Sequence, residues 1–567
     1  MPVTGRQAII EQFLADGFRY MFGNPGTVEQ GFLDALKDYP DMRYVLTLQE
    51  TVAVMVGDGY ARATRKPALV QIHSTPGLGN SIGALYQAMR GHSPLVVIGG
   101  DSGIRYQAMD SQMAGDLVGM AKPVTKWSTM VQDSASLLRI LRRAIKIAAT
   151  PPMGPVYVCL PMDILDAPCT EEVRPTSLPS TRVLPDAASI TKAVEALAAA
   201  EHPIFFIGDG IAYSDAQHEL TKLAELVGAE VWEADAGEVN MDYSHPLYQG
   251  MTGHMFGESS APIVTKGDLN FICGTYVLPE VFPLLGDIFA PTSKVIHVDL
   301  NLYEIAKSHR VDIGLLGDPK TTLAQMAAEL EAKLSPEQKK KAKERTQATG
   351  QAKETKRAAQ LKEDAAGADA TPIRMSRFVE ELAKRMPPGT ILFDEALTSS
   401  PPITRHLPPH TTGTYFLTRG GSLGVGFPGA IGAKMANPDK TVIGFSGDGG
   451  SMYTIQALWT AARHNSDVKF VVCNNASYRL LQLNIGVYWQ EREIPKHDFP
   501  LSFDLSKPAI RFDELARGMG VQAVRVEKPS EIGAAIDQAF AHSGPFLIDL
   551  VLEGDTHPER VGNTCGQ

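Results

Sequence analysis

Two polar side chains that suit a metal ion, Asp448 and Asn475, each follow a short apolar run of the sequence. A helical pattern lies between the two runs, so we predict a strand, a helix and a strand over 441–445, 452–464 and 469–473. Because the strands of such a unit are parallel, both polar residues emerge at the sheet edge where ligands bind. A carboxylate and an amide oxygen at that edge suit a hard cation such as Mg²⁺.

The glycines beside Asp448 suit a ligand that carries phosphate. Gly447, Gly449 and Gly450 let a diphosphate approach the backbone, and the following helix offers free N–H groups and the positive end of its dipole. Short glycine motifs also occur in the turns of ordinary doubly wound sheets. The pair Asn474-Asn475 at the end of the second strand favours the ligand site over an ordinary turn.

Gly447-Asp448-Gly449 followed by Asn474-Asn475 resembles the signature of enzymes that use thiamine diphosphate. The resemblance implies that Asp448, Asn475 and the backbone carbonyl of Ser477 hold Mg²⁺, which in turn holds the diphosphate of the cofactor. It also implies that Leu423, in the stretch 420–424, supports the bent cofactor from below. The further cofactor contacts that it implies are Thr398, Gly421, Gly447, Gly449, Gly450, Ser451 and Tyr478.

Glu50 lies where a predicted strand, 44–48, meets a predicted helix, 51–64. A glutamate at this place ordinarily complements the helix dipole. The resemblance implies instead that Glu50 hydrogen-bonds the pyrimidine ring of the cofactor and is catalytic. In this family the cofactor bridges the first domain of one subunit and the last domain of another. The resemblance therefore implies a homodimer or homotetramer with active sites at the dimer interface.

The stretch 71–77, with His73 at its centre, resembles benzoylformate decarboxylase. An imidazole titrates near neutral pH, so the resemblance gives His73 a catalytic proton transfer. Thr27, in Asn-Pro-Gly-Thr, stands where that family has a serine that contacts the substrate carboxylate. The second catalytic histidine of that enzyme has no counterpart in the stretch 274–282. Tyr276 in this stretch and His254 before it are the alternatives. The helix after Ser477 also differs, so a benzoyl substrate is not expected.

The fold class that we predict is α/β, with three Rossmann-like parallel-sheet domains. Continuous apolar runs suit strands of a parallel sheet, and the resemblance implies a pyrimidine-binding, a middle and a diphosphate-binding domain. Gly208-Asp209-Gly210 is not followed by a full dinucleotide motif, so FAD in the middle domain is not expected. The polar stretch before the last domain is either a solvated helix or a flexible connector. The boundaries are 1–166, 187–334, 335–371 for the polar linker, and 372–556.

Composition excludes several other classes of protein. The chain has 567 residues, of which 44% are apolar, and a formal net charge of −11. This charge argues against nucleic-acid binding, and no apolar run reaches the length of a membrane span. The five cysteines show no CxxC spacing, so neither a disulfide framework nor a zinc site is indicated. Small-molecule partners and a cytoplasmic location are therefore expected.

These observations predict an enzyme that cleaves or forms the bond next to a carbonyl. The first choice is decarboxylation of a 2-oxo acid to an aldehyde, with carboligase side activity. The alternative is an aldehyde carboligase or lyase, or an acetolactate synthase-like enzyme that makes 2-hydroxyketones. His73 favours the first and the absent middle-domain histidine favours the second. A non-catalytic protein that keeps the fold is a third reading, against which the intact Glu50, Asp448 and Asn475 argue.

Overall fold

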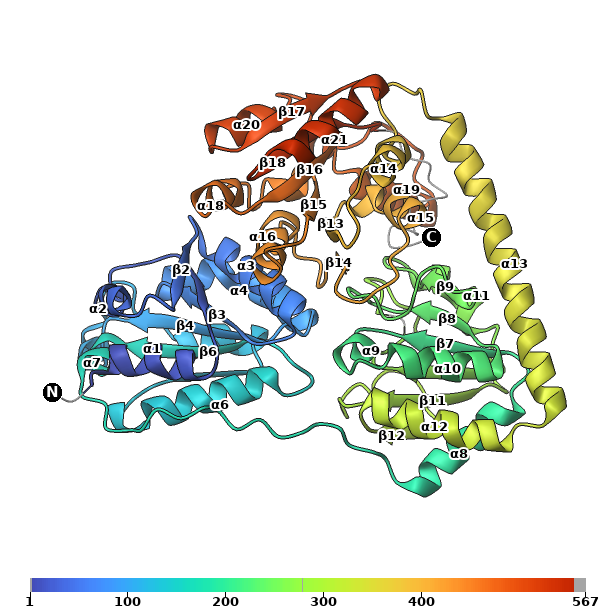
Figure 1. Ribbon diagram of the computed structural model, residues 1–567, viewed down its shortest axis with the longest axis horizontal. Helices are drawn as coiled ribbons and strands as arrows, with labels where there is room; N and C mark the ends of the chain where they lie inside the picture. Colours follow the sequence, from blue (N-terminus) through green and yellow to red (C-terminus); the bar gives the residue numbers. More distant parts are fainter. Residues whose placement is uncertain (1–2, 278, 555–567) are drawn as a thin grey trace.

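Three parallel sheets of six strands each organise the computed structural model, which describes residues 3–277 and 279–554 (Figure 1). The sheets follow one another along the chain, and every strand pair in them is parallel. Helices cover both faces of each sheet, as the crossover connections of parallel strands require. This arrangement confirms the predicted α/β class with three Rossmann-like sheets.

The first sheet has the strand order β2-β1-β3-β4-β6-β5. Its central strands are fully buried, which explains their continuous apolar sequences. Its strands are β1 Tyr20–Gly23, β2 Arg43–Leu46, β3 Ala68–Ile72, β4 Leu95–Asp101, β5 Trp127–Met130 and β6 Val156–Pro161. Its helices are α1 Gly5–Ala15, α2 Gln30–Ala35, α3 Glu50–Thr64, α4 Thr75–Arg90, α5 Leu117–Ala121, α6 Leu137–Ala149 and α7 Met162–Asp166.

The second sheet forms the middle of the chain, with the order β12-β11-β10-β7-β8-β9. Its strands are β7 Pro203–Ile207, β8 Glu230–Glu233, β9 Tyr248–Met251, β10 Leu269–Cys273, β11 Lys294–Asp299 and β12 Ile313–Leu316. Its helices are α8 Ala187–Ala199, α9 Gly210–Tyr213, α10 Gln217–Val227, α11 Gly257–Val264 and α12 Pro319–Lys333.

The third sheet repeats the topology of the first, with the order β14-β13-β15-β16-β18-β17. Its strands are β13 Ile391–Glu395, β14 Tyr415–Leu417, β15 Val442–Gly447, β16 Val468–Asn474, β17 Gln522–Val526 and β18 Phe546–Val551. Its helices are α14 Met375–Ala383, α15 Pro401–His406, α16 Gly426–Ala436, α17 Asp448–Ser451, α18 Ala457–Arg463, α19 Arg479–Glu491, α20 Phe512–Gly518 and α21 Ile532–Ala541.

The helix predicted over 452–464 is wrong in its first half. The chain forms the short helix α17 directly after β15, then turns, and α18 begins only at Ala457. The hydroxyl of Thr454 donates to the carbonyl of Gly424 at 2.6 Å, and a side chain on Gly424 would collide with Tyr453 and Thr454. This contact with the loop before α16 holds the segment in a turn, which a local helical pattern does not reveal.

The polar stretch after the middle domain is a helix, α13, over Pro336–Ala366. Ser335 caps it and Pro336 occupies its first turn, both of which favour a helix start. Figure 1 shows α13 running along the outside of the molecule from the second sheet to the third. Lys353 donates to the carbonyl of Tyr243 at 2.6 Å, and Asp364 pairs with Arg405 at 2.7 Å. Of the two predictions for this stretch, a solvated helix or a flexible connector, the helix is therefore confirmed.

The first and last sheets meet through α3 and α16. A Cβ on Gly59 would lie 2.1 Å from the carbonyl oxygen of Gly429, and a Cβ on Gly432 would lie 2.1 Å from that of Val56. The two helices therefore touch backbone to backbone, which only glycine permits. This contact fixes the start of α3, where Glu50 lies, relative to the loop before α16.

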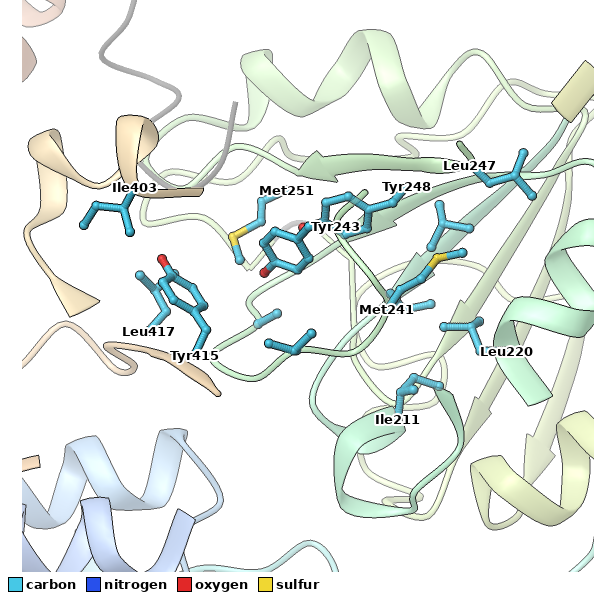
Figure 2. Close-up of a cluster of buried hydrophobic side chains, with 14 of the residues drawn as sticks. Ile211, Leu220, Met241, Tyr243, Leu247, Tyr248, Met251, Ile403, Tyr415 and Leu417 are labelled. Atoms are coloured by element: carbon cyan, nitrogen blue, oxygen red, sulfur yellow. The ribbon is translucent and has the colours of Figure 1, made fainter. Parts of the chain in front are cut away.

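The middle and last sheets share one apolar core, part of which Figure 2 shows. Ile403, Tyr415 and Leu417 from the last domain face Tyr243 and Met251 from the middle domain. The rings of Tyr243 and Tyr415 meet edge to face, with centroids 6.4 Å apart. In the described parts of the chain, no helix is both long and apolar enough to cross a membrane.

Candidate active site

Asp448 begins α17 at the end of β15 and is 4% exposed. Its Oδ1 accepts a hydrogen bond from the backbone N–H of Gly449 at 2.7 Å, whereas its buried Oδ2 has no hydrogen-bond partner. Burial raises the pKa of this carboxyl to about 6. Buried polar atoms are almost always paired, so an unpaired carboxylate oxygen calls for a missing partner. A cation satisfies that need.

Asn475 follows β16, which pairs with β15 so that Cys473 lies opposite Gly447. Asp448 and Asn475 therefore leave neighbouring parallel strands at the same edge, as the sequence predicted. The side-chain oxygen of Asn475 accepts from the N–H of Ser477 at 3.1 Å, across Ala476 in the left-handed region at φ 54°. The backbone of this turn lies beside the Asp448 carboxylate, whose pKa it partly lowers against the effect of burial. A carboxylate with neighbouring amide and carbonyl groups is a donor set that suits Mg²⁺.

The predicted diphosphate contacts surround this edge. A Cβ on Gly447 would meet no atom within 4 Å, so space is open there, whereas the ring of Tyr478 covers Gly449. The hydroxyl of Ser451 donates to the carbonyl of Gly447 at 2.8 Å. Thr398 lies half-buried in the short turn Leu397–Ser399 that follows β13. Gly450 lies in α17 beside the side chains of Ser446 and Glu395, so the open space shown at this edge is at Gly447.

The loop before α16 holds Gly421 and Leu423, and Glu395 secures it from below. Gly421 is exposed with φ 73°, and Leu423 is half-buried. The fully buried Glu395, at the end of β13, accepts from the N–H of Gly426 at 2.7 Å and also from that of Gly424. Burial raises the pKa of Glu395 to about 7. The role of Glu395 in holding this loop was not predicted from the sequence.

Glu50 is the first residue of α3 and is 5% exposed. The cap of α3 is Gln49, whose side chain accepts from the N–H groups of Thr51 and Val52, so Glu50 is free of that task. Its Oε2 accepts from Asn80 at 3.0 Å, and a Cβ on Gly77 would lie 2.7 Å from its Oε1. The carboxylate is thus held inside the protein against α4. A glutamate that only complements the dipole of α3 would not need this buried position.

His73 follows β3 and pairs with Glu29, which the sequence analysis did not single out. The Nδ1 of His73 lies 3.1 Å from Oε2 of Glu29, and Gly26 packs against the ring. Glu29 is 3% exposed and also accepts from the N–H of Gly100 at 3.0 Å. Burial raises the pKa of Glu29, and the charge of His73 offsets part of that rise. Thr27, in the same turn, is exposed.

Tyr44 lies between the two carboxylates of the first domain. Its hydroxyl donates to the side-chain oxygen of Gln71, and its pKa is raised by burial and then by the charges of Glu29 and Glu50. The first domain therefore gathers two carboxylates, a phenol and the His73 imidazole in one place. Among the described residues, no hydrogen bond or ion pair joins this group to the group around Asp448 within one chain.

The two alternatives for a second proton-transfer residue lie in different settings. The hydroxyl of Tyr276 accepts from Arg90, and the ammonium of Lys307 lies 3.5 Å from the centre of its ring. His254 is exposed in the segment before α11. Neither residue contacts His73 or Glu50 through a hydrogen bond in the described chain.

Three family models match this chain in sequence. They are the N-terminal TPP binding domain of thiamine pyrophosphate enzymes over residues 3–120, the central domain over 190–326, and the C-terminal TPP binding domain over 399–550. The first match contains Glu29, Glu50 and His73, and the last contains Leu423, Asp448 and Asn475. Thr398 and Glu395 lie just before the last match. The central match covers the middle sheet.

Individual relatives match over nearly the whole chain. Benzoylformate decarboxylase of Pseudomonas aeruginosa is 30% identical over 96% of this chain and 98% of its own length. A probable acetolactate synthase large subunit of Methanocaldococcus jannaschii is 30% identical over 97% of this chain and 92% of its own. The solved thiamine diphosphate-dependent 4-hydroxybenzoylformate decarboxylase of Rhodococcus jostii superposes with a TM-score of 0.84 at 25% identity, covering 98% of this chain and 100% of that one. The chain therefore belongs to the thiamine pyrophosphate enzyme family, in the group that includes benzoylformate decarboxylase and acetolactate synthase.

Proposed function

We propose that this protein is a thiamine diphosphate- and Mg²⁺-dependent decarboxylase that converts a 2-oxo acid to an aldehyde, with carboligase side activity. The observation that carries the proposal is the pair of His73 and buried Glu29 beside Glu50. A buried carboxylate that orients an imidazole is a common arrangement for proton transfer. Release of an aldehyde requires a proton on the reacting carbon, and this pair would supply a group for that proton transfer.

The chain fits the cofactor at both ends. The unpaired Oδ2 of Asp448, with the oxygens of Asn475 and the carbonyl of Ser477, would hold Mg²⁺ and through it the diphosphate. Leu423 would support the cofactor from below, and Thr398 and Ser451 would bind its phosphate oxygens. When bound, thiamine diphosphate supplies a nucleophilic carbon and an electron sink for cleavage next to a carbonyl.

The side chains of the first domain would control the protons. Glu50, held by Asn80, would hydrogen-bond the pyrimidine ring and keep it in the form that activates the reacting carbon. Thr27 would orient the substrate carboxylate with its exposed hydroxyl. His73, oriented by Glu29, would deliver a proton to the reacting carbon after CO₂ has left.

Both halves of the site would come together in a dimer. The Glu50 group and the Asp448 group share no hydrogen bond within one chain, among the described residues. Because the family resemblance implies it, we place each active site between the first domain of one subunit and the last domain of another, in a homodimer or homotetramer. The four cysteines of the described chain are free and buried, which suits a reducing compartment such as the cytoplasm.

A carboligase or acetolactate synthase-like activity is the second candidate. Its support is the middle domain, where Tyr276 is engaged by Arg90 and Lys307 and no histidine stands between 274 and 282. Without a second proton donor from the middle domain, addition to a second carbonyl would compete better with protonation of the reacting carbon. Relatives that are named as probable acetolactate synthases are consistent with this candidate.

The test is release of CO₂ from a panel of 2-oxo acids: pyruvate, 2-oxobutyrate, a branched-chain acid, phenylpyruvate and benzoylformate. Each is offered with thiamine diphosphate and Mg²⁺, then with either one omitted. We expect CO₂ from at least one acid only when both are present, and an Asp448→Asn variant to need far more Mg²⁺. Silence on every acid, with coupling of two aldehydes to a hydroxyketone, would move the assignment to the second candidate.

A further inference from the structure

The loop that would support the cofactor, residues 418–425, has little stiffness of its own. It joins β14 to α16, and three of its residues lie in the left-handed region: Gly420 at φ 68°, Gly421 at 73° and Gly424 at 97°. Glycine loses more conformational freedom on ordering than any other residue. The position of Leu423 therefore depends on what anchors the two ends of this glycine loop.

The anchor at the end near α16 is internal to the last domain. Glu395 accepts from the N–H groups of Gly424 and Gly426, and Thr454 donates to the carbonyl of Gly424 at 2.6 Å. These bonds hold the loop immediately after Leu423. Nothing in them restrains the residues before it.

The anchor at the other end lies in the middle domain. Arg419 is 7% exposed, and its guanidinium pairs with Asp209 and, at 3.1 Å, with Asp235. The same guanidinium donates to the carbonyl of Arg90 at 3.2 Å. The side chain of Arg419 thus leaves the last domain and ends among groups of the middle and first domains.

Asp209 is itself held rigidly. It belongs to Gly208-Asp209-Gly210, the motif after β7 that resembles part of a dinucleotide site, and it is 3% exposed. Its carboxylate accepts from the N–H groups of Gly237 at 2.9 Å and Glu238 at 3.0 Å. In addition, the carbonyl of Gly237 accepts from the N–H of Leu417, at the end of β14. The motif therefore binds the segment that borders the glycine loop.

From this arrangement we infer that Asp209 and Arg419 are positioning residues for the active site. The pair fixes the start of the glycine loop, and Glu395 fixes its end. Together these contacts determine the position of Leu423, which would lie under the cofactor. The middle domain then contributes to catalysis by holding a loop of the last domain. The inference rests on the proposed function, because that function gives Leu423 its task.

The test uses Asp209→Asn and Arg419→Lys, with Glu238→Gln as the matched control. Glu238 is 2% exposed and pairs with Arg62 at 3.0 Å in the same junction, so its variant also removes one buried charge, while Arg62 keeps its bonds to two carbonyls. Amide hydrogen exchange of a peptide spanning 418–426 is measured on the full chain without cofactor. Binding of thiamine diphosphate in the presence of Mg²⁺ is then measured by fluorescence quenching.

We expect hydrogen exchange in 418–426 to be at least about tenfold faster in Asp209→Asn and Arg419→Lys than in the control. We also expect the dissociation constant for thiamine diphosphate to rise by about tenfold, which is the usual effect of losing an outer positioning partner. The KM for the substrate should change by less than about twofold, because substrate contacts lie elsewhere. Arg419→Lys keeps the charge, so it should fold even if Asp209→Asn does not. Exchange no faster than in Glu238→Gln would overturn the inference. If the parent protein binds no thiamine diphosphate but the loop variants still exchange faster than the control, the proposed function is wrong and the anchoring of the loop by Asp209 and Arg419 stands.

Discussion

The Nδ1 atom of His73 lies 3.1 Å from Oε2 of Glu29, a carboxylate that is 3% exposed and 44 residues away in sequence. Glu29 accepts hydrogen bonds from the N–H groups of Gly26 and Gly100, so it is held in place and fixes the Nδ1 edge of the imidazole ring. Which ring nitrogen carries the proton is set by such a partner. In the proposed mechanism Nε2, for which the described chain shows no hydrogen bond, would be the atom that faces the substrate.

The first prediction concerns this pair. Glu29→Gln should lower the turnover number for CO₂ release by at least about tenfold, the scale of a lost proton-transfer contribution. Because Glu29 acts through His73, the double variant Glu29→Gln/His73→Ala should be no slower than His73→Ala within about threefold. Steady-state rates of the four proteins complete the cycle. Losses that multiply in the double variant would mean that the two residues act independently.

Glu50 should be indispensable. Glu50→Gln is expected to reduce cofactor-dependent turnover by at least about a hundredfold, which is about 2.7 kcal/mol of barrier. The variant keeps the size of the side chain and its contact with Asn80 but cannot carry the carboxylate charge. Glu201→Gln, at an exposed position, is the control and should match the parent. Turnover of Glu50→Gln within tenfold of the parent would remove Glu50 from the mechanism.

The contact of α3 with α16 should be intolerant of any side chain. Gly59→Ala places a methyl group 2.1 Å from the carbonyl oxygen of Gly429, so the two helices must separate. Overpacking of this kind costs about 1–3 kcal/mol of folding free energy. Gly518→Ala, in helix α20, meets no atom within 4 Å and should be neutral or slightly stabilising. Urea unfolding followed by circular dichroism compares the two, and equal midpoints would contradict the backbone contact.

Stability should depend on pH through Glu233. Burial raises its pKa to about 7, while Tyr243, Tyr248 and Asn240 donate to its carboxylate. The folded state therefore binds its proton more tightly than the unfolded state, whose value is near 4.5. The sign follows: the stabilisation is complete below pH 4.5 and is lost as the pH rises through 7, by about 3 kcal/mol at most.

The comparison that isolates Glu233 is with Glu233→Gln, whose amide oxygen can still accept from the two tyrosines. Its melting temperature should fall less than that of the parent between pH 5 and pH 8. If the melting temperatures of the two proteins change by the same amount between pH 5 and pH 8, Glu233 does not titrate in that range.

Local sequence was enough for the parts of the site that lie on one supersecondary unit. Asp448 and Asn475 could be placed together because β15 and β16 are consecutive and parallel, and Glu50 because it stands where β2 leads into α3. The turn at Thr454 could not be seen, since its cause is a bond to Gly424 in another segment. Arg419 and Asp209 are 210 residues apart, and no spacing rule joins them.

Glu29 was within reach of sequence reasoning. It stands two residues after Thr27, in the segment that follows strand β1, at the sheet edge where ligands bind. What the pattern lacked was the position of His73 on the neighbouring strand β3, which pairs with β1 only in the folded sheet. Side chains that meet through sheet order, rather than through chain order, are the ones that a single sequence leaves unassigned.

A decarboxylase is distinguished from a carboligase by the yield of free aldehyde per CO₂ released from the best 2-oxo acid, with thiamine diphosphate and Mg²⁺ present and then omitted. We expect one aldehyde for each CO₂ with both present, and neither product without them. CO₂ without free aldehyde, balanced by a 2-hydroxyketone or acetolactate-type product, would contradict the decarboxylase assignment. Equal CO₂ release without thiamine diphosphate would contradict the cofactor itself.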